Sequence, residues 1–141
     1  MREGVEITSR PAAVAGKCGE AADLGEVLLG YRVDRDVGAL IMVAAGGVLT
    51  EIARDRSLRL APIDLAMARE MIAEVRSLTA LAGYRGRPAG DLEALAHAIV
   101  ALSRLADDGS IAEAEINPLI VREAGEGVIA VDALVKLARN A

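Results

Sequence analysis

Residues 114–121, AEINPLIV, and residues 128–135, VIAVDALV, are apolar enough to be two paired β-strands, yet they carry Glu115, Asn117 and Asp132. A polar group inside such a strand costs folding free energy unless a hydrogen bond or a ligand satisfies it. The glycine-containing stretch between the two segments favours a tight turn, so we expect an antiparallel hairpin.

A turn centred on Gly125 and Glu126 sets the register of this hairpin. It predicts that Leu119 lies opposite Asp132 and that Asp132 is diagonal to Asn117. Because strand side chains alternate between faces, Glu115, Asn117 and Asp132 would share one side. Pro118 has no amide hydrogen, so the strand ladder should be interrupted beside Asn117 at an edge or a bulge.

The three polar side chains supply only oxygen ligands, which hard cations such as Mg²⁺ prefer. Phosphate oxygens of a nucleotide commonly complete such a coordination shell. A surface hairpin is the other interpretation, with Glu115 solvated, Asn117 beginning a turn and Asp132 bound to backbone. Spacing alone leaves both interpretations open, and it favours the surface hairpin.

Composition excludes several classes of protein. A chain of 141 residues fits one domain, and with 53% hydrophobic residues but only two aromatic ones, Tyr31 and Tyr84, its core must be aliphatic. The net charge of −5, without basic runs, gives nucleic acid little to bind. The longest apolar stretch, residues 39–49, is shorter than the about 20 residues that cross a membrane. A single cysteine, Cys18, and a start without an apolar signal core favour the cytoplasm.

The chain pattern predicts an α+β fold with a mostly antiparallel sheet packed with two helices. Residues 1–24 have no sustained period and are expected to be an irregular extension before a domain over 25–141. Residues 26–33 and 38–45 flank a charged turn as a second hairpin. Amphipathic helices are expected over residues 62–82 and from Asp91 to just before Gly109. Their apolar stripes comprise Leu65, Ala68, Ile72, Val75 and Thr79 in the first and Leu92, Leu95, Ile99, Leu102 and Ala106 in the second.

Three motifs occur together in one order: IMVAAGGVLTEIARDRSLRLAPID at 41–64, GYRGRP at 83–88, and EINPLIV followed by GVIAVDALV at the end. Over roughly residues 25–137 this combination resembles the C-terminal part of the ATP-grasp domain of NDP-forming acyl-CoA synthetases. That family includes the succinyl-CoA synthetase β subunit and ADP-forming acetyl-CoA synthetases. The resemblance implies the C-terminal lobe of an ATP-grasp domain.

The resemblance also implies a Mg²⁺ site for ATP or ADP. Asn117 and Asp132 match magnesium ligands, and Glu115 matches a further carboxylate that binds the metal or supports its ligands. Magnesium there would bridge nucleotide phosphates and neutralise charge as a phosphoryl group moves.

Further positions match the family's nucleotide and phosphate site. Gly46 and Gly47 match a glycine pair that lets backbone approach phosphate, although an ordinary turn explains them equally well. Arg59 matches a phosphate-binding charge, but a lone arginine is more often ion-paired or solvated. Glu26 and Glu51 match acidic positions of the family. The sequence does not distinguish a role of these residues in the active site from a role in structural ion pairs.

Other residues with reactive or charged side chains receive no site role. His97 lies off the apolar stripe of its helix and is expected to be exposed, and Cys18 has no partner for nucleophilic chemistry. Arg85 and Arg87 form a small basic loop that most simply aids solubility.

The family's preceding lobe and its CoA-binding and ligase domains have no counterpart in the sequence, so the chain is expected to be inactive without them or a subunit that carries them. Its partners would be the nucleotide and those domains, with no nucleic acid and no membrane, and homo-oligomers are possible. The alternative function is a non-catalytic assembly or regulatory module derived from the ATP-grasp fold. The sequence does not identify the acyl acid or choose between ATP and GTP.

Overall fold

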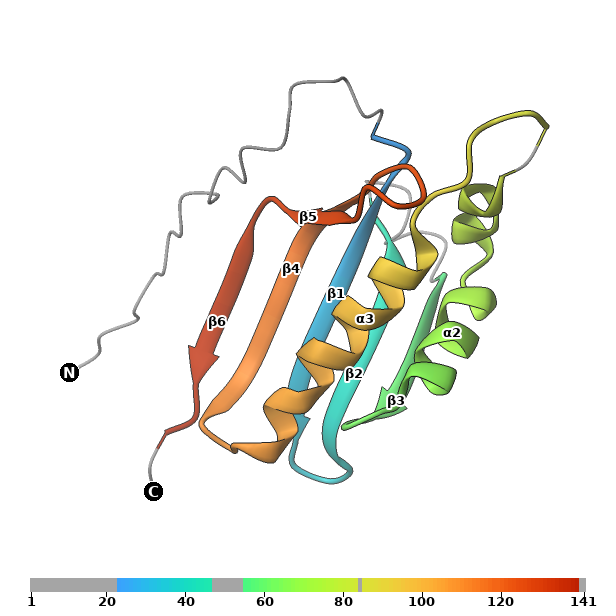
Figure 1. Cartoon of the computed structure of the whole chain (residues 1–141). Coiled ribbons are helices and arrows are strands. Elements are labelled where there is room, and N and C mark those ends of the chain that lie inside the picture. The colour runs from blue at the N-terminus through green and yellow to red at the C-terminus, as the bar shows by residue number, and fades with distance from the viewer. Residues whose placement is uncertain (1–22, 47–54, 84, 140–141) are drawn as a thin grey trace.

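The computed structural model describes residues 23–46, 55–83 and 85–139. It contains one six-stranded sheet in which every strand pair is antiparallel. The strands are β1 (Gly25–Asp34), β2 (Gly38–Ala45), β3 (Arg56–Leu60), β4 (Ile111–Val121), β5 (Val128–Ala130) and β6 (Ala133–Leu137). The sheet order is β3-β2-β1-β4-β5, and β6 pairs with the same edge of β4 as β5 does, further along that strand (Figure 1).

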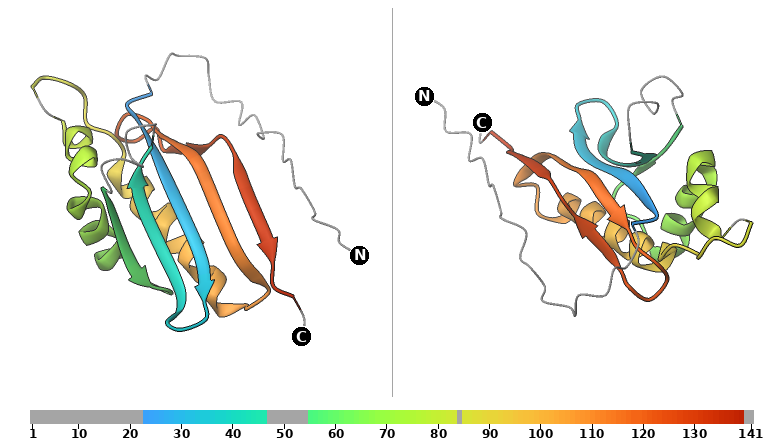
Figure 2. Two further views of the ribbon diagram at one scale, coloured as in Figure 1. Left: turned by 180° about the vertical axis from the view of Figure 1, so that it is seen from behind. Right: turned by 90° about the horizontal axis from the view of Figure 1, so that it is seen from above.

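The helices lie on one face of this sheet. They are α2 (Leu65–Glu74), the 3₁₀ segment η1 (Arg76–Ala82), α3 (Leu92–Ser103) and the 3₁₀ segment η2 (Arg104–Asp107). Seen from behind, no helix of the described residues covers the opposite face (Figure 2). We call this uncovered side the open face. The predicted α+β fold, an antiparallel sheet packed with helices, is confirmed.

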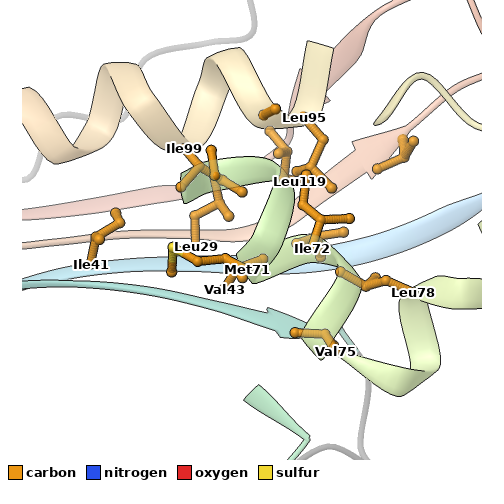
Figure 3. Close-up of a cluster of buried hydrophobic side chains, with 14 of the residues drawn as sticks. Leu29, Ile41, Val43, Met71, Ile72, Val75, Leu78, Leu95, Ile99 and Leu119 are labelled. Carbon is orange, nitrogen blue, oxygen red and sulfur yellow. The ribbon is translucent and has the colours of Figure 1, made fainter. Parts of the chain in front are cut away.

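The core lies between the sheet and the helices (Figure 3). Val27, Leu29 and Tyr31 of β1 alternate into it and are almost completely buried. Met71 of α2 and Ile99 of α3 meet them from the helix side. Apart from Tyr31 the large buried side chains are aliphatic or methionine, as the composition predicts.

Carboxylates define where both α-helices begin. Asp64 caps α2, because its carboxylate accepts a hydrogen bond from Met67 N at 2.8 Å. Asp91 caps α3 as expected, through a bond from Ala94 N at 3.0 Å. Pro62 precedes the capping residue of α2 instead of occupying its first turn.

The prediction of one helix over residues 62–82 is wrong. The α-helix ends at Glu74, Val75 is extended, and a 3₁₀ segment follows. The carboxylate of Asp55 accepts hydrogen bonds from the backbone N–H groups of Arg76 and Ser77 and from the Ser77 hydroxyl. These bonds, which lower the pKa of Asp55, satisfy amides that would otherwise continue the helix.

The apolar stripe also changes at this break. Thr79, which the helical spacing placed on the stripe, is exposed, and the buried residues are instead Leu78 and Leu81, three apart as in a 3₁₀ helix. In contrast, Leu95 and Ile99 of α3 are buried and His97 is exposed, as predicted.

Several sequence expectations concern residues outside the described ranges. These are residues 1–22 of the expected extension, including Cys18, as well as Gly47, Glu51 and Tyr84. Within the described residues, no helix is both long and apolar enough to cross a membrane.

Candidate functional site

The hairpin of β4 with β5 and β6 forms, but its predicted register is wrong by two residues. Leu119 pairs with Ala130 and not with Asp132. The loop is centred earlier than expected, because Arg122 N donates to Gly127 O at 3.2 Å and Glu126 N donates to Glu123 O at 2.8 Å. The predicted faces are only partly right, because Leu119, which the predicted register placed on the side of Asn117, is buried in the core.

The corrected register brings Asn117 and Asp132 closer than predicted. They are direct neighbours across the strand pair, and Asn117 N donates a 3.0 Å hydrogen bond to Asp132 O. The ladder resumes on both sides, with Pro118 O accepting from Val131 N at 3.0 Å and Ile116 paired with Ala133. Backbone pairing therefore holds the two polar residues at one level of the sheet.

A bulge lies at this level, as Pro118 predicted. On the β1 side, Val27 pairs with Leu119 but Leu29 pairs with Ile116, so Asn117 and Pro118 together oppose Leu28. The extra residue lets Leu119 point into the core after the bulge while Ile116 packs against the core before it.

Two of the predicted metal residues, Glu115 and Asn117, lie on the open face. Tyr31 and Leu29 face the core, so Gly30 between them faces outward, and its partner on β4 is Glu115. Alternation along β4 from Glu115 places Asn117 on the same side. Glu115 pairs with Leu134 of β6, and Asp132, which is exposed between β5 and β6, lies directly across from Asn117.

The chemistry of these three residues fits a hard divalent cation. They offer two carboxylates and one amide oxygen, Asn117 and Asp132 are exposed, and Glu115 is half-buried. Among the described residues, no group of three or more His, Cys, Asp or Glu side chains is gathered closely enough to hold a metal by itself.

Glu26 and Gly46, two predicted nucleotide-site residues, are brought into contact. Gly46 N donates a hydrogen bond to Glu26 O at 2.6 Å. A Cβ on Gly46 would lie 2.8 Å from Glu26 Cβ and 2.9 Å from Glu26 O, closer than such atoms approach. Glu26 is exposed and pairs with Ile120 of β4. Glycine at position 46 is thus required by the close approach of β1.

Arg59 lies away from this group. Its guanidinium pairs with Glu74 of α2 and donates to Ser57 Oγ at 3.2 Å. Ser57 is buried and its hydroxyl also bonds Glu74, so the pair belongs to the helix-covered face. The ion pair lowers the pKa of the Glu74 carboxyl and raises that of Arg59. A phosphate contact by Arg59 would require phosphate to replace Glu74.

The open face also has a pocket of about 310 Å³ next to Glu115. Gly30 lies at its floor, Met42 and Leu58 line it from β2 and β3, and Glu113 and Glu115 line it from β4. We call it the Gly30 pocket.

The family model of the ATP-grasp domain matches residues 16–137, which is most of the chain. This chain belongs to the ATP-grasp domain family. Its sequence is 39% identical over 114 residues to the β subunit of ADP-forming acetate–CoA ligase II from Pyrococcus furiosus, covering 79% of this chain and 48% of that protein. It is 33% identical over 113 residues to the ADP-forming 4-hydroxybutyrate–CoA ligase of Nitrosopumilus maritimus, covering 79% of this chain and 16% of that protein.

Solved structures show the same fold. A crystal structure of a Pyrococcus horikoshii protein superposes with a TM-score of 0.77 at 35% identity, covering 82% of this chain and 49% of that one. An acetyl-coenzyme A synthetase of Ca. Korarchaeum cryptofilum, in complex with coenzyme A and Mg-AMPPCP, superposes with a TM-score of 0.74 at 35% identity. It covers 81% of this chain and 53% of that one. This ATP-grasp chain spans about half the length of the β subunits and solved chains that it matches.

Sequence reasoning missed two features of the ATP-grasp sheet that border the site. β3 (Arg56–Leu60) was not expected as a strand. Three of its five residues are arginine or serine, so the sequence lacks the alternation of apolar and polar residues that is typical of a strand. Gly30 was passed over inside the apolar run of β1. A glycine in a strand interior is a signal for close approach of a ligand or another backbone, and it could have identified the pocket.

Proposed function

We propose that this chain is the C-terminal lobe of an ATP-grasp, NDP-forming acyl-CoA synthetase and that it supplies the Mg²⁺-nucleotide phosphate site. The single observation that carries this proposal is the backbone pairing of Asn117 with Asp132, with Glu115 two residues away along β4. In this proposal Asn117 and Asp132 are magnesium ligands, and Glu115 binds the metal or orients its ligands.

The bound Mg²⁺-nucleotide would supply the phosphoryl group, and the metal would neutralise charge as that group moves. The chain's own residues hold and orient it: the backbone pairing at Asn117 and Asp132 fixes two oxygen donors beside each other. Near the end of β2, Gly46 with the adjacent Gly47 would let backbone approach phosphate, and Glu26 lies beside Gly46.

The identity of the relatives supports an acid–thiol ligase. Those named above are ADP-forming acetate–CoA and 4-hydroxybutyrate–CoA ligases, and one solved relative is a complex with a magnesium nucleotide analogue. Because the chain covers about half of the matched β subunits, turnover would require a second lobe and CoA-binding domains, on the same polypeptide or on a partner subunit.

The test is a titration of the purified full chain with Mg-ADP. Binding is measured by the shifts of the protein's NMR signals, a method that can measure millimolar affinities. Asn117→Ala and Asp132→Ala should each weaken Mg-ADP binding by about tenfold or more, since loss of metal-site groups commonly has effects of this size. Asp36→Asn, an exposed carboxylate of the β1–β2 turn, is the matched control and should leave the affinity within about twofold of the wild type.

Two results would contradict the proposal. One is an absence of Mg-dependent nucleotide binding, which would favour a non-catalytic module of the same fold. The other is equal binding by the Asp132→Ala and Asp36→Asn variants, which would place the nucleotide elsewhere.

A further inference from the structure

The two edges of the sheet differ in how they are protected. Figure 1 shows β3 at one edge and β6 at the other. In β3, the hydrogen bond from Ala61 N to Ala39 O and the strand register leave the backbone of Leu58 directed toward the free edge. The side chain of Arg59 occupies this edge, because its Nη1 donates a 2.8 Å hydrogen bond to Leu58 O. A guanidinium group in that position hinders pairing with a further strand.

The edge formed by β6 has no partner strand within residues 23–46, 55–83 and 85–139. Asn117 N donates to Asp132 O at 3.0 Å, and Ala138 N donates to Ser110 O at 2.8 Å. The even-numbered residues of β6 therefore bond to β4. Because backbone groups alternate in direction along a strand, those of the odd-numbered residues point away from β4. The residues with outward backbone groups are Ala133, Val135 and Leu137.

The side chains of β6 do not prevent pairing at this edge. Leu134 and Leu137 are 49% and 61% exposed although they are large apolar residues. Lys136 is the one charged residue of the strand, and its Nζ lies 3.0 Å from a carboxylate oxygen of Glu113 in the same chain. A lysine commonly protects an edge strand from pairing. Here its charge is balanced within the chain, so β6 offers an apolar edge without proline.

The outward backbone groups of β6 are self-complementary. When two β6 strands run antiparallel about a two-fold axis at Val135, the two Val135 residues pair with each other. Ala133 of each copy then pairs with Leu137 of the other. All three outward-directed residues are matched in this register, and each matched pair can exchange two hydrogen bonds.

The same register brings compatible side chains together. Leu134 shares the open face with its partner on β4, Glu115, and it would lie across from Lys136 of the second copy. The aliphatic stem of that lysine can cover the exposed leucine while its ammonium stays at Glu113. Two-fold pairing therefore buries apolar surface without placing like charges opposite each other.

A second copy joined through β6 fits better than a head-to-tail chain of copies. Joining β6 of one copy to β3 of the next would require Arg59 to leave Leu58 O, and such a contact does not close on itself. The two-fold contact closes after two copies. Since β6 has five residues and spans about 17 Å, the interface lies at the small end of specific interfaces and the dimer should be weak.

We propose that β6 is a dimerisation edge, through which two copies of this chain join antiparallel about Val135 into one continuous sheet. The proposal does not depend on the proposed nucleotide site. It assigns a partner to the unpaired edge of the described sheet.

The first experiment measures the mass of the purified full chain by sedimentation between about 10 μM and about 1 mM, the range in which weak interfaces associate. The average mass should rise from 14.6 kDa toward twice that value and no further. Leu134→Lys places lysines opposite each other at two symmetric positions and should weaken association by about tenfold. Leu60→Lys, the same exchange at an exposed leucine of β3, is the matched control and should leave association within about twofold.

A double variant tests the register. Leu134→Lys combined with Lys136→Leu again places one lysine opposite one leucine in each pair, so association should recover toward that of the wild type. Hydrogen exchange of the wild type gives a second readout. The amides of Ala133, Val135 and Leu137 should be protected only at concentrations where the dimer forms, whereas those of Leu134 and Lys136 bond to β4 and should be protected at both.

Each outcome decides for or against the dimer edge. A mass of 14.6 kDa over the whole range, or growth beyond twice that mass, would refute it. Equal association of the Leu134→Lys and Leu60→Lys variants, or no recovery in the double variant, would place the contact elsewhere. Should a variant fail to fold, as judged by circular dichroism, the wild-type exchange pattern decides alone, because unprotected outward amides at high concentration exclude pairing through β6.

Discussion

Replacement of Asp91 by alanine should destabilise the chain more than its position at a helix end suggests. One carboxylate oxygen caps α3 through Ala94 N at 3.0 Å. The other accepts hydrogen bonds from Gly125 N at 3.1 Å and Gly127 N at 2.9 Å, in the turn between β4 and β5. A single side chain thus ties the first turn of a helix to the hairpin that carries Asn117 and Asp132.

The magnitude follows from the bonds that would be lost. Loss of a capping residue costs about 1 kcal/mol, and each hydrogen bond from the hairpin turn contributes about 1 kcal/mol, so Asp91→Ala should lower the free energy of unfolding by about 3 kcal/mol. Asp91→Asn can keep the cap but offers an NH₂ group to the two glycine N–H donors. It should therefore cost about 2 kcal/mol.

The assay is urea unfolding followed by far-UV circular dichroism at neutral pH, with Asp36→Ala as a control for loss of an exposed aspartate. A value for Asp91→Ala within about 0.5 kcal/mol of the wild type would refute the reasoning. Hydrogen exchange of the turn amides should show the same effect locally, because their bonds to the carboxylate are lost.

The same carboxylate predicts a pH dependence. The backbone hydrogen bonds from Ala94, Gly127 and Gly125 lower the pKa of Asp91 from its ordinary value of 3.8. A lowered pKa in the folded state means that this stabilisation is present above pH 3.8 and is lost as the pH falls through 3.8 toward the folded-state pKa. Asp91→Asn should therefore lose less stability over that acidic interval than the wild type.

Two further predictions concern other local contacts. Gly46→Ala should destabilise the chain by about 1–3 kcal/mol, because the added Cβ would collide with Glu26. At Gly30 an added Cβ has space, so Gly30→Ala should be neutral or stabilising by up to about 1 kcal/mol. Urea unfolding of both variants measures the two changes in stability, and equal values would contradict the prediction. Asp55→Ala removes the three hydrogen bonds from Arg76 and Ser77 and should cost about 3 kcal/mol at about 1 kcal/mol for each bond. The loss should be seen first as faster hydrogen exchange in η1, and unchanged exchange there would contradict the account of the helix break.

Local sequence signals predicted much of the fold because the relevant interactions are local. Asp91 stands directly before the apolar stripe of α3, which is the sequence signal of a capping residue at a helix start. The charged turn between residues 33 and 38 indicates a hairpin. The break after Glu74 was not predictable in this way, because its cause is Asp55, about twenty residues earlier in the chain. Helical periodicity alone continues through Val75 to Thr79.

The hairpin that carries Glu115, Asn117 and Asp132 was predictable from the sequence, but its geometry was less so. The predicted register was wrong by two residues, and the bulge beside Pro118 turns Leu119 into the core instead of toward the side of Asn117. The direct opposition of Asn117 and Asp132 depends on loop hydrogen bonds near Gly127 that composition does not specify. For Arg59, the sequence offered both phosphate binding and ion pairing, and the structure shows an ion pair with Glu74.

The one-sided covering of the sheet has a practical consequence for protein engineering. Along β1, Val27, Leu29 and Tyr31 are committed to packing, while the intervening Leu28 and Gly30 contact neither helix layer nor core. Exchanges at these alternate positions should change the chemistry of the open face while the packed positions stay as they are. A library restricted to positions 28 and 30 would measure how far the proposed nucleotide site depends on the chemistry of that face.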